Sequence, residues 1–174
     1  MANVIQVVGE VANGKLVPIT AELLGAARRL VGESSGAVGC ALMGSGVERL
    51  AQEAIAFGAE EALVVDEPAL AEYNSDAYIQ AMARLAEHAA PSIILFGQTN
   101  LGRDLAPRLA FRLNTGVVMD CVELAWRATG WWRPGPATAA TLAPLTSCGR
   151  TRRSRPCAPS PRTRWNTTAA ARAR

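Results

Sequence analysis

Short apolar runs alternate with amphipathic stretches over the first 126 residues. The apolar runs are rich in Val, Ile and Leu, a composition typical of strands that are buried on both faces. The intervening stretches place apolar residues three and four positions apart, which predicts helices. We expect strands at 3–11, 36–44, 61–66, 92–97 and 116–124, and helices at 19–31, 46–58, 75–90 and 100–114.

Turn and cap residues mark several boundaries between these elements. Asn13-Gly14 is a hairpin-type turn signal directly after the first strand. Thr20 and Ser75 are the expected N-caps of two helices, because their hydroxyl groups can accept backbone N–H groups there. Gly58 follows the second helix at the position where a left-handed residue commonly ends a helix.

Buried strands separated by helices predict an α/β, Rossmann-like three-layer domain with a mostly parallel sheet over residues 1–126. Ligands of such domains gather at the carboxyl ends of the strands. That edge should carry three loops, at 44–46, 66–68 and 97–104.

The charge distribution divides the chain at about residue 126. Residues 1–126 hold 8 basic and all 15 acidic residues, a formal −7, whereas residues 127–174 hold 10 Arg and no Asp, Glu or Lys, a formal +10. Ala, Arg, Thr, Pro, Gly and Ser make up 40 of these last 48 residues. Such a segment buries too little apolar surface to fold, so we expect residues 127–174 to be a disordered tail.

The acidic domain is a poor candidate for binding nucleic acid, which needs clustered Lys and Arg. The alternative of a basic tail that binds nucleic acid or anionic lipid stays open. Against it, the tail lacks Lys, spaced aromatic residues and an amphipathic pattern.

The four cysteines show no CxxC spacing and no neighbouring His, which argues against zinc. Cys40 and Cys121 lie in apolar runs and are expected to be buried thiols of a reduced, cytoplasmic protein. We expect no signal peptide and no membrane insertion, because no basic segment precedes the first apolar run and no run reaches about 20 apolar residues.

The stretch "GSGVER" (44–49) follows a strand and opens a helix, like half of a dinucleotide-binding fingerprint. Arg49 stands where the third glycine of that fingerprint belongs, and Glu48 would lie close to a phosphate. A plain strand-to-helix turn is therefore the favoured interpretation over phosphate binding.

The loop "GQTNLGRD" (97–104) leads into another helix N-terminus, where free N–H groups attract anions or capping oxygens. It supplies our candidate interface or anion-site residues, which are Gly97, Gln98, Thr99, Asn100, Arg103 and Asp104. The alternative is a capped helix in which Arg103 and Asp104 pair locally or with a neighbour.

Nothing in the sequence predicts catalysis. His88, the single histidine, is expected at the surface near a helix end, and we find no paired carboxylates, nucleophile elbow or metal cluster. Two other functions stay open: a stand-alone nucleotide-binding module, and an interaction module without redox activity.

Specific strings join the predicted elements. "NGKLVPITAELLGAARRL" (13–30), "DEPALAEYNSDAYIQAM" (66–82) and above all "ILFGQTNLGRDLAPRLAFRLNTGVVMDCVEL" (94–124) closely resemble the N-terminal domain of electron transfer flavoprotein alpha subunits. The resemblance covers about residues 3–125.

This resemblance implies an electron carrier rather than an enzyme with its own substrate. In that family an alpha and a beta subunit form a heterodimer, hold FAD, and pass electrons from dehydrogenases to a downstream acceptor. The resemblance places most FAD-binding residues in a second domain, so we expect none of them in this chain. It makes residues 1–126 the scaffold domain that faces the beta subunit.

The resemblance also predicts a strand reading Val-x-Thr-Arg-Pro-x-Tyr-Gly-Gly-Asn where this chain has "WWRPGPATAAT" (131–141). Tryptophan has one codon, TGG, so a frame displaced by two nucleotides encodes Val at Trp131-Trp132. The following codons allow Ala-Thr-Arg-Pro-Gly-Tyr-Gly-Gly-Asn in order. Our hypothesis is that the gene is frameshifted and that the sequence from about 126–131 onward is out of frame, in a truncated chain.

Overall fold

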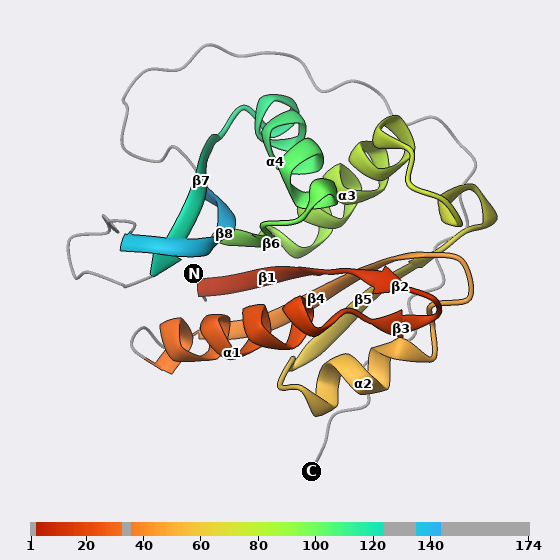
Figure 1. The fold of residues 1–174 in the computed structure, drawn as a ribbon, viewed down its shortest axis with the longest axis horizontal. Helices are drawn as coiled ribbons and strands as arrows, with labels where there is room; N and C mark the ends of the chain where they lie inside the picture. The colour runs from red at the N-terminus through yellow and green to blue at the C-terminus, as the bar shows by residue number, and fades with distance from the viewer. Residues whose placement is uncertain (1–2, 33–35, 124–134, 144–174) are drawn as a thin grey trace.

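A six-stranded sheet organises the domain, in the order β5-β4-β1-β6-β8-β7 (Figure 1). The computed structural model describes residues 3–32, 36–123 and 135–143. The strands are β1 (Asn3–Gly9), β2 (Val11–Ala12), β3 (Lys15–Leu16), β4 (Gly36–Gly44), β5 (Glu61–Asp66), β6 (Ile93–Gly97), β7 (Gly116–Glu123) and β8 (Gly135–Ala143). The helices are α1 (Pro18–Gly32), α2 (Leu50–Ala56), the 3-10 turn η1 (Pro68–Leu70), α3 (Ser75–Ala89) and α4 (Asn100–Leu113).

Four parallel strands form the core of the sheet, as the apolar runs predicted. β1 pairs with β4 on one side and with β6 on the other, and β4 pairs with β5, all in parallel. The chain moves outward from β1 to β5 and then crosses back through α3 to β6. The strand order therefore reverses between β1 and β6, and this switch point is where ligands of open α/β sheets bind.

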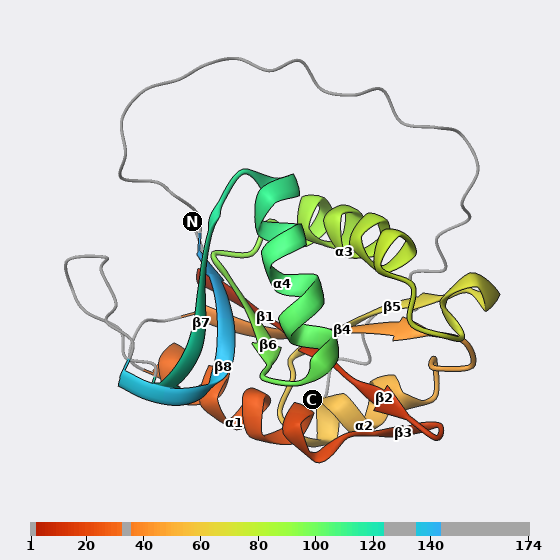
Figure 2. The ribbon, with the colours of Figure 1, turned by 45° about the horizontal axis from the view of Figure 1, so that its top comes forward.

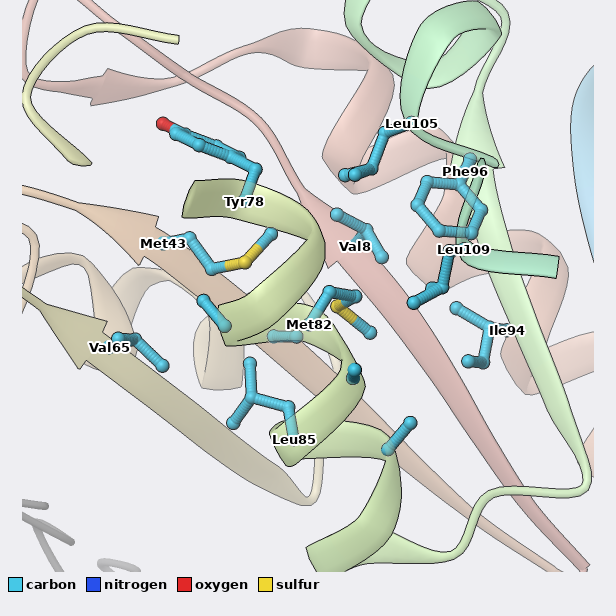
Figure 3. Close-up of a cluster of buried hydrophobic side chains, with 14 of the residues drawn as sticks. Val8, Met43, Val65, Tyr78, Met82, Leu85, Ile94, Phe96, Leu105 and Leu109 are labelled. Carbon is cyan, nitrogen blue, oxygen red and sulfur yellow. The ribbon is translucent and has the colours of Figure 1, made fainter. Parts of the chain in front are cut away.

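Helices cover both faces of this sheet. α1 and α2 lie against one face, over a core that includes Leu24 and Leu95. α3 and α4 lie side by side on the other face, in both Figure 1 and Figure 2. Figure 3 shows the core beneath them, in which Met82, Leu105 and Leu109 pack on strand side chains such as Phe96. The predicted three-layer α/β fold is confirmed.

The predicted turn is confirmed, but the predicted N-cap residues are not. Asn13 and Gly14 form the β2–β3 turn with φ of 52° and 68°, as predicted. Two predicted N-caps are wrong. Thr20 lies within the first turn of α1, where its hydroxyl accepts the Glu10 N–H at 3.0 Å. Asn74 rather than Ser75 caps α3, because its side-chain oxygen accepts two N–H groups of the first turn.

The last two strands close one edge of the sheet in antiparallel pairing. β8 lies between β6 and β7 and runs antiparallel to both. The prediction that all of 127–174 lacks structure is therefore wrong for Gly135–Ala143. This segment contains no Asp, Glu, Lys or Arg, and the unpaired backbone groups of β6 and β7 offer it hydrogen-bonding partners. The rest of the predicted tail, 127–134 and 144–174, lies outside the described residues.

Candidate functional site at the strand ends

The carboxyl edge of the parallel strands brings together three segments that are distant in sequence. Glu10 follows β1, Asp66 ends β5, and Gly97 ends β6 at the switch point. The loop after β4 lies beside Asp66, so all three loops that the sequence marked, at 44–46, 66–68 and 97–104, lie at this edge. Whether they form an open ligand site depends on where their hydrogen-bonding groups point.

The glycine loop after β4 is closed by the Asp66 carboxylate. Its Oδ1 accepts the Gly46 N–H at 2.8 Å, and its Oδ2 accepts the N–H groups of Val47 at 2.7 Å and Glu48 at 3.2 Å. A phosphate in a dinucleotide site would need these same donors, and it would meet the negative charge already bound to them. The loop is the strand-to-helix turn that the sequence favoured.

Arg49, which replaces the fingerprint's third glycine, has a structural contact instead. Its guanidinium donates to the Gly14 carbonyl at 3.0 Å and so links the loop to the β2–β3 hairpin. This contact directs the Arg49 guanidinium toward a backbone carbonyl and not toward an anion site.

The loop after β6 is closed by its own side chains and by close backbone packing. Thr99 caps α4, and its hydroxyl accepts the Gly102 N–H at 3.1 Å. Gly102 packs on the end of β6 so tightly that a Cβ there would lie 1.9 Å from the Gly97 carbonyl oxygen. The two glycines of "GQTNLG" thus permit close helix–strand packing.

A buried carboxyl group lies behind this loop. Glu10 is 9% exposed, and its Oε1 accepts the Thr99 hydroxyl at 2.6 Å. Burial raises the pKa of Glu10 from its ordinary value of 4.5, and the hydrogen bond from Thr99 partly opposes that rise. The contact joins the ends of β1 and β6, the two strands between which the strand order reverses.

Gln98 and Arg103 both turn toward Asp120 on β7. The Gln98 amide donates to the Asp120 carboxylate, and the Arg103 guanidinium lies 3.8 Å from the same oxygen. Asp120 has a φ of 54°, at an irregularity in the β7–β8 pairing. The arrangement presents exposed polar groups from the loop and from β7 on one surface.

Asp104 does not pair with its neighbour Arg103. Its carboxylate accepts the Tyr73 hydroxyl at 2.7 Å and the Arg108 Nε–H at 2.9 Å. The hydrogen bond from Tyr73, followed by that from Arg108, lowers the pKa of Asp104. Asp104 therefore ties α4 to the segment before α3, whereas Asn100, the first residue of α4, is exposed.

Sequence reasoning found the 97–104 loop but missed its partners. Glu10, Asp66 and Asp120 are brought to it or to the neighbouring loop by tertiary pairing across 18 to 89 residues of chain. The sequence signal that could have identified such a partner is a carboxylate at the end of an apolar strand, as in "ALVVD" (62–66).

The cysteines and the histidine that the structure describes lie where the sequence predicted them. Cys40 and Cys121 are buried, as predicted, and burial raises the pKa of the Cys40 thiol to about 12. His88 is exposed in the last turn of α3, also as predicted. The described residues contain no cluster of His, Cys, Asp and Glu that could hold a metal ion. None of their helices has the length and apolarity needed to cross a membrane.

Comparison with known proteins decides the family. The model of the electron transfer flavoprotein domain matches residues 5–145, most of the chain. The chain belongs to the electron transfer flavoprotein family. The matched span includes β8 and ends two residues beyond it.

Its relatives include alpha subunits of this family. The chain is 44% identical over 120 residues to the electron transfer flavoprotein subunit alpha of Thermoanaerobacterium thermosaccharolyticum, covering 69% of this chain and 36% of the relative. It is 41% identical over 134 residues to the corresponding subunit of Megasphaera elsdenii, covering 75% and 40%. It is 39% identical over 115 residues to an acryloyl-CoA reductase electron transfer subunit beta of Anaerotignum propionicum, covering 66% and 31%.

The resemblance to the N-terminal domain of the alpha subunits is thus confirmed. The matched part of the chain spans roughly a third to two fifths of the length of these curated relatives.

Proposed function

We propose that this chain supplies the scaffold domain of an alpha-type electron transfer flavoprotein subunit and docks against a beta-type subunit. In this proposal the assembled heterodimer carries electrons on FAD from dehydrogenases to a downstream acceptor in the cytoplasm. The chain contributes structure and a docking surface, and it has no substrate of its own.

The observation that carries the scaffold role is the self-closure of the strand ends. The N–H groups after β4 are bonded to Asp66, and the loop after β6 is bonded to Glu10 and Asp120 through Thr99 and Gln98. A ligand at the switch point would have to break these contacts. A stand-alone nucleotide-binding module requires an open phosphate cradle at this edge, so this geometry argues against it.

The described residues do not fit FAD. The glycine loop that most resembles a pyrophosphate cradle already holds a carboxylate across three N–H groups. We therefore assign the flavin to residues outside this domain or to the partner.

The docking surface for the beta-type subunit is proposed to include the exposed polar groups beside the switch point. Arg103 and Asp120 are 60% and 75% exposed at their side chains, and Asn100 is exposed next to them. Exposed arginine and carboxylate groups favour the correct orientation of a partner more than they add to affinity.

Co-purification tests this proposal. The chain is co-expressed with a beta-type subunit from an electron transfer flavoprotein operon, and the tagged chain is recovered. We expect the beta subunit to co-purify with the chain. Arg103→Glu should reduce its recovery more than Arg29→Glu, a matched charge reversal at an exposed position of α1. Full recovery with Arg103→Glu would reject the proposed surface, and no recovery of the beta subunit with the unaltered chain would reject the scaffold role.

We also propose that the sequence from about 126–131 onward is read out of frame. The displaced frame can encode the family strand over residues 131–141, a segment that overlaps β8. Sequencing the gene through codons 120–145 and beyond codon 174 tests this. A displaced frame that spells the strand and continues into a flavin-binding domain supports the proposal, whereas a confirmed visible frame with no such continuation rejects it.

A further inference from the structure

β5 is an edge strand whose outer side is open in the part of the chain that the structure describes. It pairs with β4 alone and ends the strand order on that side (Figure 1). Helices cover both of its faces, since Leu63 and Val65 lie in the core with α3 and Val64 packs against the core with α1 and α2. The N–H and C=O groups that point away from β4 meet no described strand.

The two edges of the sheet differ in how they are protected against further pairing. β7, at the opposite edge, has an irregular register around Cys121, and Asp120 there has a φ of 54°. Irregularities of this kind twist an edge out of reach of another strand. β5 pairs with β4 in an unbroken register, and it contains no Pro, Gly or Lys. Its edge is therefore regular enough to accept an added strand.

The net charge of the domain is concentrated around this open edge. Residues 46–90, from the loop before α2 to the end of α3, hold 9 acidic and 2 basic residues, a formal −7. The parts of the domain before and after this segment each hold 3 acidic and 3 basic residues, so the segment accounts for the whole net charge. Glu60 and Glu61, at the start of β5, are exposed, and neither carboxylate has a hydrogen-bond or ion-pair partner among the described residues.

These charges determine which kind of strand the edge can accept. Two copies of β5 paired antiparallel about their centre would place Glu61 opposite Asp66, and Glu60 opposite Glu67, of the other copy. Like charges directly opposite each other destabilise a pair of strands, so a second copy of this chain is disfavoured. A strand with Lys or Arg at both ends would meet opposite charges at the same positions.

We infer that the β5 edge accepts an extended basic segment of a partner protein as an additional strand. Main-chain hydrogen bonds to β5 provide the affinity, and Lys or Arg side chains beside Glu60, Glu61 and Glu67 select the partner. The apolar centre of β5, residues 62–65, favours β-branched residues in the middle of that segment. The inference goes beyond the proposed function, because the surface proposed for the beta-type subunit includes Asp120 on β7, at the opposite edge of the sheet.

Three peptides test the inference on the full chain. The basic peptide has about eight residues, to match positions 60–67, with alternating Val and Thr in the middle and two Lys or Arg at each end. The second peptide has the same side chains but carries N-methyl groups on the backbone nitrogens of its middle residues. The third has Glu in place of every Lys and Arg. Binding is measured by fluorescence anisotropy at low and high salt, and hydrogen exchange of the β5 amides is measured by NMR.

We expect the basic peptide to bind with a dissociation constant of about 100 µM, more weakly at high salt, and to slow the exchange of N–H groups in β5. The 10 Arg of residues 127–174 compete for the same carboxylates, but they act equally on the basic and the N-methylated peptides, which have the same charge. The N-methylated peptide should therefore bind at least about tenfold more weakly, and the Glu peptide should not bind. Glu61→Lys should weaken binding about fivefold, whereas Glu22→Lys, a matched change at an exposed position of α1, should leave it unchanged.

Three results would overturn the inference. Equal binding of the basic and N-methylated peptides would show attraction to charge without strand addition. Equal binding of the basic and Glu peptides, or equal effects of Glu61→Lys and Glu22→Lys, would remove the charge argument. Binding of none of the peptides would show that the acidic residues only keep copies of the chain apart. Circular dichroism checks that the variants fold, and beta-subunit recovery remains a separate test of the proposed function.

Discussion

The loop after β4 and the loop after β6 both lead from a buried parallel strand into a helix, but their N–H groups are satisfied by different means. The first uses a carboxylate, Asp66, from the neighbouring strand β5. The second uses the hydroxyl of its own Thr99, supported by Glu10 from β1. One loop thus holds a full negative charge at its N–H groups, whereas the other holds a neutral cap backed by a buried carboxyl group.

This difference separates a loop that resembles a cofactor cradle from one that joins two strands at the switch point. The glycine-rich stretch resembles a phosphate-binding loop in sequence, yet its N–H groups already donate to the Asp66 carboxylate. The 97–102 loop has a less familiar sequence, yet it lies at the centre of the edge and connects β1, β6 and β7. Whether the backbone N–H groups of a loop already have hydrogen-bond partners therefore tells more about ligand binding here than the number of glycines does.

The largest effect should come from the helix–strand contact beneath the second loop. Gly102→Ala places a Cβ 1.9 Å from the Gly97 carbonyl oxygen, so the backbone of α4 must move. We expect a loss of about 3 kcal/mol or more in the free energy of unfolding, measured by urea denaturation. Gly25→Ala, within α1 and with no atom closer than 3.8 Å to the new Cβ, should instead stabilise by up to about 1 kcal/mol. Similar values for both variants would contradict the packing account.

The carboxylate in the first loop should matter nearly as much. Asp66→Ala removes the acceptor of three N–H groups and should cost about 2–3 kcal/mol in the free energy of unfolding. Asp66→Asn keeps one oxygen and should lose less. If Asp66→Ala unfolds at the same urea concentration as the unaltered chain, the loop does not depend on this carboxylate.

The buried carboxyl group beside Thr99 predicts a pH dependence of stability opposite in sign to that of an acid whose pKa is lowered on folding, such as Asp104. Because burial raises the pKa of Glu10 in the folded state, folding favours its protonated form. Its stabilising contribution is fully present below the ordinary pKa of 4.5 and is lost as the pH rises through the raised pKa. Relative to Glu10→Gln, the unaltered chain should lose stability from pH 4 to pH 7; a constant difference would contradict the burial effect.

The exposed pair at the edge should affect stability least. Arg103→Ala breaks a contact of 3.8 Å between side chains that are mostly solvated, so the free energy of unfolding should change by less than about 0.5 kcal/mol. Thermal unfolding of this variant checks the size of the effect. A loss as large as that of Asp66→Ala would mean that the pair holds the edge together rather than facing a partner.

The comparison of the two loops also shows how far the sequence could predict the molecule. Periodicity located β1, β4, β5, β6, β7 and the helices, because buried strands and amphipathic helices have distinct patterns. The sequence assigned two N-caps wrongly, because the roles of Thr20 and Asn74 depend on hydrogen bonds that only the folded chain makes. It also began the second helix at residue 46, whereas α2 begins at Leu50.

Two further features could not be read from local pattern. β8 has a Pro, Ala and Thr sequence without alternation, and it is a strand because β6 and β7 offer it pairing partners. The closure of the strand ends depends on Asp66 and Asp120, whose neighbours lie on other elements. The position of the 97–104 loop before a helix N-terminus made it the candidate, and the structure identified the partners of its side chains.

The most direct test of the central claim, that this domain closes its own strand ends and holds no flavin, is equilibrium dialysis of the purified chain against FAD and AMP. The account predicts no saturable binding of either compound at concentrations that fully load an assembled alpha–beta flavoprotein. One FAD or one AMP bound per chain, and lost on mutation of the 44–48 or 97–102 loop, would contradict it.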